Sequence, residues 1–233
     1  MNKPLLSLCV GAALALGAAP AWSGKDIDAG RLTLKFQENN WVGSAEMPYR
    51  LELKSAQGTF GGKAKVMSLA DADGKPLAVI YVGVTYGKTN VYSPRESCFE
   101  EARFYVRDLN DSKLENYRCV YAGGPFESDG LMSGLLRYLK DSFDKVAVPA
   151  PDEAYFTMAH VTARGGYVLH FEALMAPGFV GLAGARPVAE PPAGLPPEVA
   201  AWADRLAENA IKALTSFSGN LVVPPVEFST ATK

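Results

Sequence analysis

Apolar and polar residues alternate along much of the chain, and the period of this alternation indicates secondary structure. A period of two, typical of strands with one buried face, occurs in residues 32–36, 49–53, 102–106 and 117–121. Residues 62–69 predict a further strand. Residues 77–86 form a nearly unbroken apolar run rich in Val, Ile and Tyr, which predicts a central strand covered on both faces.

The second half of the chain predicts a hairpin between two helices. Residues 154–163 and 167–174 are two strand-like segments joined at Gly165-Gly166. Before them, apolar residues recur at helical spacing from Met132 to Phe143, with Ser128 or Asp129 as the expected N-cap. After them, a second helix is expected to begin at the prolines 196–197 and to end at Gly219. Its apolar stripe consists of Val199, Trp202, Leu206, Ala210, Leu214 and Phe217.

Strands that follow one another through short turns favour an antiparallel sheet, and amphipathic helices pack on such a sheet. The sequence therefore predicts a single α+β domain in residues 24–233, with a mainly antiparallel sheet packed by two amphipathic helices. The stretch 24–30 is expected to be a polar leader to this domain. The last third, a helix, a Gly-turned hairpin and a closing helix that ends in Ala213-Leu214-Thr215-Ser216-Phe217, resembles PsbP-like α/β/α domains. This resemblance covers under half of the chain and contains no diagnostic motif, so it implies a layout and no function.

The first 23 residues have the organisation of a cleavable secretory signal. Lys3 gives a positive start, residues 5–19 form an apolar run, and small residues precede two candidate cleavage points, before Trp22 and before Gly24. The run is too short to span a bilayer. Cys9 precedes most of the run, which disfavours a lipid-anchoring cysteine. We expect an exported protein, located in the periplasm of a bacterium or outside the cell.

Charge and cysteine content narrow the choice of partners. The chain carries 23 basic and 25 acidic residues without any basic block, so nucleic acid is not an expected partner. No stretch of the mature chain is apolar enough to span a membrane.

The mature chain keeps Cys98 and Cys119, and an even pair in an exported protein predicts one disulfide. In the hairpin formed by 102–106 and 117–121, Cys119 is expected opposite Phe104 or Tyr105, so the chain near Cys98 must fold back.

The two histidines of the chain, His160 and His170, lie in the two arms of the predicted hairpin. With a two-residue turn, His160 lies opposite Phe171 and the histidines project from different faces. A three-residue turn centred on Gly165 would instead set them side by side. The first register collects the large apolar residues of both arms on one face and is therefore favoured. We predict a packing role for His160, with no metal site and no cofactor.

Motifs for nucleophilic catalysis and for calcium binding are incomplete. Residues 130–134 come close to a nucleophile elbow, but Ser133 stands one position late and lies on a predicted helix. The loop 108–119 has Lys113 where a calcium loop needs glycine and Cys119 where it needs glutamate. We interpret this loop, and the similar stretch that begins at Asp71, as turns.

Residues 176–197 contain four glycines and six prolines and are too long for an ordinary connection. They are either a surface loop packed along the sheet by its own apolar residues, or a flap or docking segment. Phe179, Val180, Leu182 and Arg186 are the candidate binding residues. We expect an exported envelope protein that binds a ligand or partner without catalysis, the partner being another envelope protein or an apolar small molecule. The alternative is a secreted or periplasmic hydrolase with catalytic residues from dispersed loops.

Overall fold

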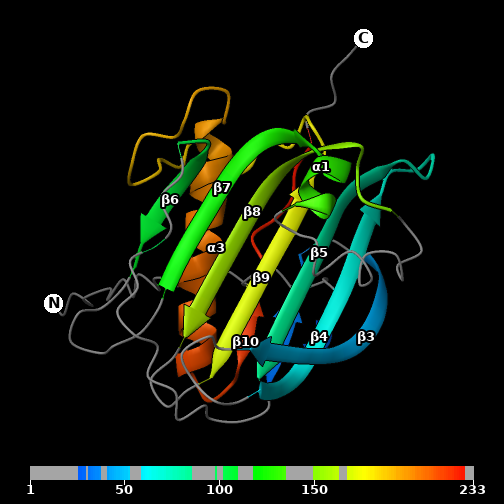
Figure 1. Cartoon of the computed structure of the whole chain (residues 1–233), viewed down its shortest axis with the longest axis vertical. Helices are drawn as coiled ribbons and strands as arrows, with labels where there is room; N and C mark the ends of the chain where they lie inside the picture. The colour runs from blue at the N-terminus through cyan, green and yellow to red at the C-terminus, as the bar shows by residue number, and fades with distance from the viewer. Residues whose placement is uncertain are drawn as a thin grey trace, which may run out of the picture.

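The computed structural model describes residues 26–29, 31–37, 41–52, 59–85, 98, 102–109, 118–134, 149–162 and 167–228. Its main element is a seven-stranded antiparallel sheet in the order β3-β4-β5-β9-β8-β7-β6 (Figure 1). The strands are β3 (Trp41–Glu52), β4 (Thr59–Ala70), β5 (Pro76–Thr85), β6 (Phe104–Asp108), β7 (Arg118–Glu127), β8 (Glu153–Thr162) and β9 (Val168–Met175). The predicted antiparallel sheet is therefore confirmed.

A second, three-stranded sheet has the order β1-β2-β10. Strands β1 (Asp26–Ala29) and β2 (Leu32–Lys35) are antiparallel, and β10 (Asn220–Val222) pairs in parallel with β2. The prediction of a polar leader at 24–30 was wrong for β1, because Ile27 and Ala29 alternate with two aspartates and are buried. This small sheet was not predicted, since its parallel pair joins the two ends of the domain.

Two helices lie in the described part of the chain, α1 (Ser128–Ser133) and α3 (Pro197–Thr215). Helix α3 begins at the predicted prolines, but Phe217, expected on its buried stripe, lies beyond its end and is fully exposed. The helix stops because Ser216 has an extended backbone and its hydroxyl donates to the carbonyl of Ala213. The N-cap of α1 is Glu127, one residue before the predicted Ser128. Residues 135–143 of that predicted helix lie outside the described residues.

Helix α3 and the small sheet cover the same face of the large sheet, which we call the helix face. Figure 1 shows α3 behind the strands, and it contacts β7 and β8. Trp202 is fully buried there, and its indole N–H donates to the carbonyls of Pro224 and Pro225. The sheet contributes Ile80, Val82, Ala159, Val161, Leu169 and Phe171 to this apolar cluster.

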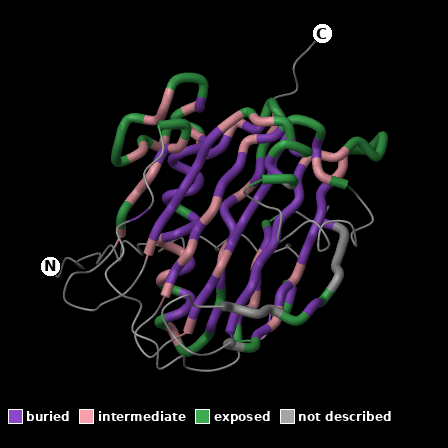
Figure 2. Tube along the Cα trace, in the orientation of Figure 1, coloured by how far each residue is buried: buried purple, intermediate pink, exposed green. Residues whose placement is uncertain are grey.

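The opposite face of the large sheet, which we call the histidine face, is also buried along its middle. Figure 2 shows that most residues of the central strands β5 and β9 are buried. Helix α1 packs on this face through Leu131, in a cluster with Val66, Val79, Phe156 and Leu174. Burial on both faces explains the nearly continuous apolar sequence of β5. Among the helices that the structure describes, none combines the length and apolarity needed to cross a membrane.

The predicted disulfide between Cys98 and Cys119 is confirmed, with Cα atoms 5.6 Å apart. Cys119 lies opposite Asp108, so the prediction that it faces Phe104 or Tyr105 was wrong. Strand β6 extends to Asp108, so the disulfide lies at the end of the β6–β7 pair where Asp108 faces Cys119. Most of the backbone around Cys98, like the expected signal in residues 1–23, lies outside the described residues.

Candidate functional site

The register of the β8–β9 hairpin brings the two histidines together. His160 lies directly opposite His170, so the prediction that His160 faces Phe171 was wrong. That prediction assumed that the large apolar residues of both arms share a face. Instead Phe156 belongs to the cluster of α1, whereas Phe171 packs towards Trp202 on the helix face. Because both faces are buried, the apolar pattern could not select the register.

The paired histidines form a compact polar group with one buried carboxylate. The ring centroids of His160 and His170 are 5.3 Å apart, and the ring planes are inclined by 65°. His170 Nε2 lies 2.8 Å from Glu172 Oε1, and the Glu172 side chain is 1% exposed. These three side chains project from the histidine face, since they occupy alternate positions of β8 and β9.

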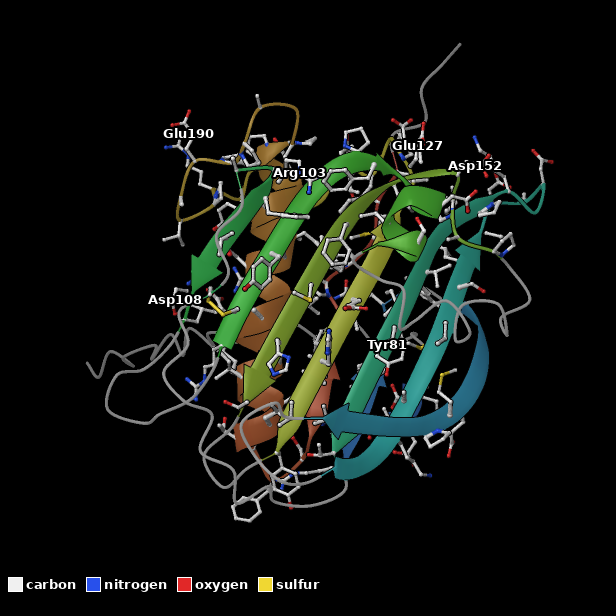
Figure 3. All side chains as sticks on the ribbon, viewed as in Figure 1. Tyr81, Arg103, Asp108, Glu127, Asp152 and Glu190 are labelled. Atoms are coloured by element: carbon white, nitrogen blue, oxygen red, sulfur yellow. A yellow bond between two sulfur atoms is a disulfide. The ribbon has the colours of Figure 1, made fainter. Side chains whose placement is uncertain are left out.

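Two neighbouring rows of side chains cross the histidine face at this point. One row contains Cys119, His160 and His170, and the next contains Tyr121, Met158, Glu172 and Tyr81. The ring of Tyr81 meets that of His170 edge to face, with centroids 6.4 Å apart. Figure 3 shows Tyr81 near the middle of the sheet, on the side of α1. The polar group therefore lies on the central strands β8 and β9, and its two histidines stand near the hairpin end of these strands.

Electrostatics keep His160 uncharged. Burial lowers the pKa of His160 to about 3, and the neighbouring His170 acts in the same direction. A neutral imidazole has one ring nitrogen with a lone pair, which can accept a hydrogen bond or bind a metal ion. In His170 an Nε2–H that donates to Glu172 makes Nδ1 the nitrogen with the lone pair.

The four candidate binding residues of the 176–197 segment do not gather into one site. Phe179 is buried, and its ring lies 5.5 Å from that of Trp202 and 5.9 Å from that of Phe228. Val180 and Leu182 are half-buried, and their backbone N–H groups donate to Glu227 and Glu198. Arg186 is exposed. The structure thus favours the interpretation of a packed surface loop for this stretch.

Gly181 explains how closely this segment approaches α3. Its φ of 63° lies in the left-handed region, and a Cβ at this position would overlap the carbonyl oxygen of Glu198. The same carbonyl oxygen accepts the N–H of Leu182. The first turn of α3 therefore fixes the segment at this point.

A second polar group, which the sequence did not indicate, joins this segment to α3 and β6. Asp204 Oδ2 accepts hydrogen bonds from the Tyr105 hydroxyl at 2.8 Å and the Val188 backbone N–H at 3.4 Å. It also lies 3.3 Å from the guanidinium of Arg107. Burial, and then the hydrogen bond to Asp204, raises the pKa of Tyr105. This group stands at the rim of the helix face and fastens the segment near Val188.

The other candidates from the sequence have structural partners. Ser133 is exposed, and its hydroxyl donates to the carbonyl of Gly130 within α1. Asp71 Oδ1 accepts the N–H groups of Asp73 and Lys75, as expected for a turn. No group of three His, Cys, Asp or Glu side chains within the described ranges is arranged to hold a metal ion.

Comparison of the chain with protein-family models, with curated proteins and with solved structures gives no match. The functional argument therefore depends on the chemistry of the paired histidines and Glu172.

Proposed function

We propose that the chain is an exported, non-catalytic binding protein of the cell envelope, whose ligand binds at the paired histidines. The observation that carries this proposal is the Glu172 carboxylate, which is 1% exposed and lies 2.8 Å from His170 on β9, the central strand of the large sheet. Taking a carboxylate out of water is unfavourable by several kcal/mol unless it is paired. Ionisable groups placed at such a cost are characteristic of functional sites, and Glu172 joins no separate element to the sheet through its contact with His170.

Export is supported by two features of the chain. The first 23 residues have the pattern of a secretory signal, and the Cys98–Cys119 disulfide is typical of proteins from oxidising compartments. Both features favour the periplasm or the cell exterior. The partner classes expected from the sequence, another envelope protein or an apolar small molecule, stay predictions, as does the PsbP-like layout of the last third.

A hydrolase is the second candidate function, and one observation favours it. The contact between His170 and Glu172 resembles that between a general base and the carboxylate that orients it. The nucleophiles considered from the sequence do not complete this arrangement. Cys98 and Cys119 are bonded to each other, and Ser133 is exposed on α1 with its hydroxyl engaged in the helix. Binding without catalysis therefore fits the described side chains better.

The chain offers a direct test, because it contains only two histidines. An NMR spectrum of the untagged exported protein shows imidazole signals from His160 and His170 alone. These signals are followed while metal ions, small carboxylic acids and an apolar fluorophore are added in turn. We expect one of these classes to shift both signals saturably. Glu172→Gln should weaken this response, whereas Glu153→Gln, an exposed glutamate of the same hairpin, should not.

The hydrolase alternative is tested on the same samples with chromogenic esters, amides and phosphoesters. Turnover that is present in the original protein and lost in His170→Ala would establish the hydrolase and overturn the binding proposal. If no ligand class shifts either imidazole signal while the protein remains folded, the proposed binding site is wrong.

A further inference from the structure

The two imidazoles stand at the separation of two ligands of one metal ion. Their ring centroids are 5.3 Å apart. With metal–nitrogen bonds of about 2.0 Å and a tetrahedral angle between them, two ligating imidazoles have ring centres about 5 Å apart. His160 and His170 lie directly opposite each other on β8 and β9, so the backbone pairing of the two strands keeps the two rings close together.

Glu172 occupies the place of an outer-shell partner behind one of these ligands. A metal-binding histidine commonly donates its second ring N–H to a carboxylate, which orients the ring and makes it a better donor. The contact of 2.8 Å between His170 Nε2 and Glu172 Oε1 has this form. The carboxylate also lies next to the site, and because Glu172 is only 1% exposed, its attraction for a cation is weakly screened by solvent.

The identity of the metal follows from the third donor. Zinc sites are built from Cys, His, Asp and Glu, and no group of three such residues suits a metal ion within the part of the chain described. Cys119 lies opposite His160, but its sulfur is bonded to Cys98. Met158 lies on the histidine face two residues before His160 and opposite Glu172. Diagonal neighbours across two antiparallel strands are within reach of a side chain of this length.

We propose that His160, His170 and the thioether of Met158 form a binding site for one copper(I) ion. This inference rests on the proposed binding function and names its ligand. Imidazole nitrogens suit copper as well as zinc, and a soft thioether donor such as Met158 favours copper(I) over the harder divalent ions. A single positive charge also matches the single carboxylate beside the site, whereas a divalent ion would leave a buried excess charge.

The test uses the exported protein, purified without a histidine tag. Copper(I), generated with ascorbate and buffered by a competing chelator, is titrated into the protein, and thiol titration confirms that the disulfide stays closed. Zinc is titrated in parallel. We expect one copper(I) ion per chain, bound more tightly than zinc. X-ray absorption should show nitrogen and sulfur neighbours of the copper, and both imidazole NMR signals should shift.

Variants assign the donors. His160→Phe and His170→Phe should each abolish stoichiometric binding. Glu172→Gln should weaken copper(I) binding about 10- to 100-fold, the usual effect of losing an outer-shell partner. Met158→Leu should weaken copper(I) binding by at least about tenfold, since a direct ligand contributes no less than an outer-shell one. It should also remove the sulfur neighbour from the absorption spectrum. Met175→Leu, on the same sheet but buried on the helix face, is the matched control and should bind copper(I) normally.

Two results would overturn the inference. One is copper(I) binding that is absent or survives in both histidine variants. The other is a preference for zinc with no effect of Met158→Leu. In either case the copper(I) inference is wrong, but the proposed binding function stands if another ligand class shifts the imidazole signals. If no ligand class shifts them, the proposed function is wrong as well. Thermal melting of each variant shows whether loss of binding reflects loss of the fold.

Discussion

The two faces of the large sheet are built from the same strands but differ in where their polar groups lie. On the helix face, the centre is apolar around Trp202, and the charged pair of Asp204 and Arg107 lies at the rim. On the histidine face, His170 and Glu172 lie on the central strand β9, and two apolar clusters share the face with them. The helix face thus has the organisation of an ordinary core, and the histidine face does not.

This difference separates groups that stabilise the fold from groups that the fold tolerates. The carboxylate of Asp204 on α3 joins three parts of the chain, because it accepts hydrogen bonds from Tyr105 on β6 and from the backbone of Val188 between β9 and α3. Its removal should loosen those elements. Glu172 contacts a residue two positions away on its own strand, so it ties no separate element to the sheet through that contact. Substitution of Asp204 should therefore mainly lower stability, and substitution of Glu172 should mainly lower ligand binding.

The largest loss of stability is expected from Phe179→Asp. Phe179 is 2% exposed and lies against Trp202 in the core of the helix face. Losing a buried aromatic side chain costs about 3 kcal/mol or more, and the new carboxylate would be buried without a partner. The free energy of unfolding, measured by denaturant titration with circular dichroism, should fall by at least this amount. The imidazole response to ligand should survive wherever the protein is folded.

Val188→Asp is the control for that substitution. Val188 belongs to the same segment, but its side chain is 71% exposed. The free energy of unfolding should change by no more than about 0.5 kcal/mol, as for most surface substitutions. If Phe179→Asp were equally mild, Phe179 would not be packed, and the interpretation of residues 176–197 as a flap or docking segment would be the better one.

The disulfide provides the next largest effect, this time on the histidine face. Cys98 and Cys119 are separated by 21 residues, and both are buried beside Tyr121. Closing a loop of this size stabilises a fold by about 3 kcal/mol in the chain-entropy model. The double variant Cys98→Ala/Cys119→Ala should lose about that much, measured under the same oxidising conditions. Peptide mapping without reductant should recover the linked pair from the original protein, and two free thiols there would contradict the structure.

The sequence predicts local features of both faces because apolar periodicity is a local signal. Most strands of the large sheet could be predicted in this way, although residues 41–48 of β3 were missed. The start of α3 was predicted from its prolines, and the disulfide from the even pair of cysteines. The small sheet could not, because its parallel pair joins Thr33 to Asn220, and no local pattern records so distant a contact. Strand β1 was missed for the same reason, as its two buried residues gain their burial from that sheet and the core beneath it.

The candidate site could not be predicted because it depends on a shift of one residue in the β8–β9 pairing. A shift of this size moves every side chain of one strand to the other face relative to its partner. The choice between registers assumed that Phe156 and Phe171 share a face, which holds only for a sheet buried on one side. In this sheet they pack on different faces. The unbroken apolar run of β5 already indicated that both faces of the sheet are covered. The same conclusion holds for the neighbouring β8–β9 hairpin, so its large apolar residues need not share one face.

A smaller effect is expected from Tyr105→Phe at the rim of the helix face. This substitution removes the hydroxyl that donates to Asp204 and should cost about 1–2 kcal/mol, since it leaves a buried carboxylate with one partner fewer. Burial and Asp204 raise the pKa of Tyr105 above its ordinary value of 10.0. The stabilisation is therefore complete below pH 10 and is lost above it, where the tyrosine ionises in the unfolded chain but not in the folded one.

The comparison between this variant and the original protein isolates Tyr105 from the other tyrosines. The difference in free energy of unfolding should be constant from pH 7 to pH 9 and should shrink as the pH rises beyond 10. A difference that grows in alkali would mean that the folded protein stabilises the ionised tyrosine, contrary to its burial beside Asp204.

The smallest effect is expected from Glu46→Gln on the outer strand pair, away from both buried faces. Glu46 Oε1 lies 3.0 Å from Lys63 Nζ and Oε2 lies 2.7 Å from Lys65 Nζ, and these lysines lower the pKa of Glu46 to about 2. Its side chain is 46% exposed, so solvent screens most of the attraction. Because the pKa in the fold lies below the ordinary value of 4.5, the contribution is present above pH 4.5 and is lost as the pH falls towards 2.

Thermal melting should therefore show a slightly less stable Glu46→Gln variant at pH 7, with a difference smaller than that of Tyr105→Phe. The difference should shrink in 1 M salt, where the Debye length is about 3 Å, and it should vanish near pH 2. A loss of stability that persists in acid and in salt would have to come from packing of the side chain. Contacts on the outer strand pair would then contribute to stability through packing, as contacts on the buried faces do. The exposed fraction of a side chain would no longer predict how much its contacts stabilise this sheet.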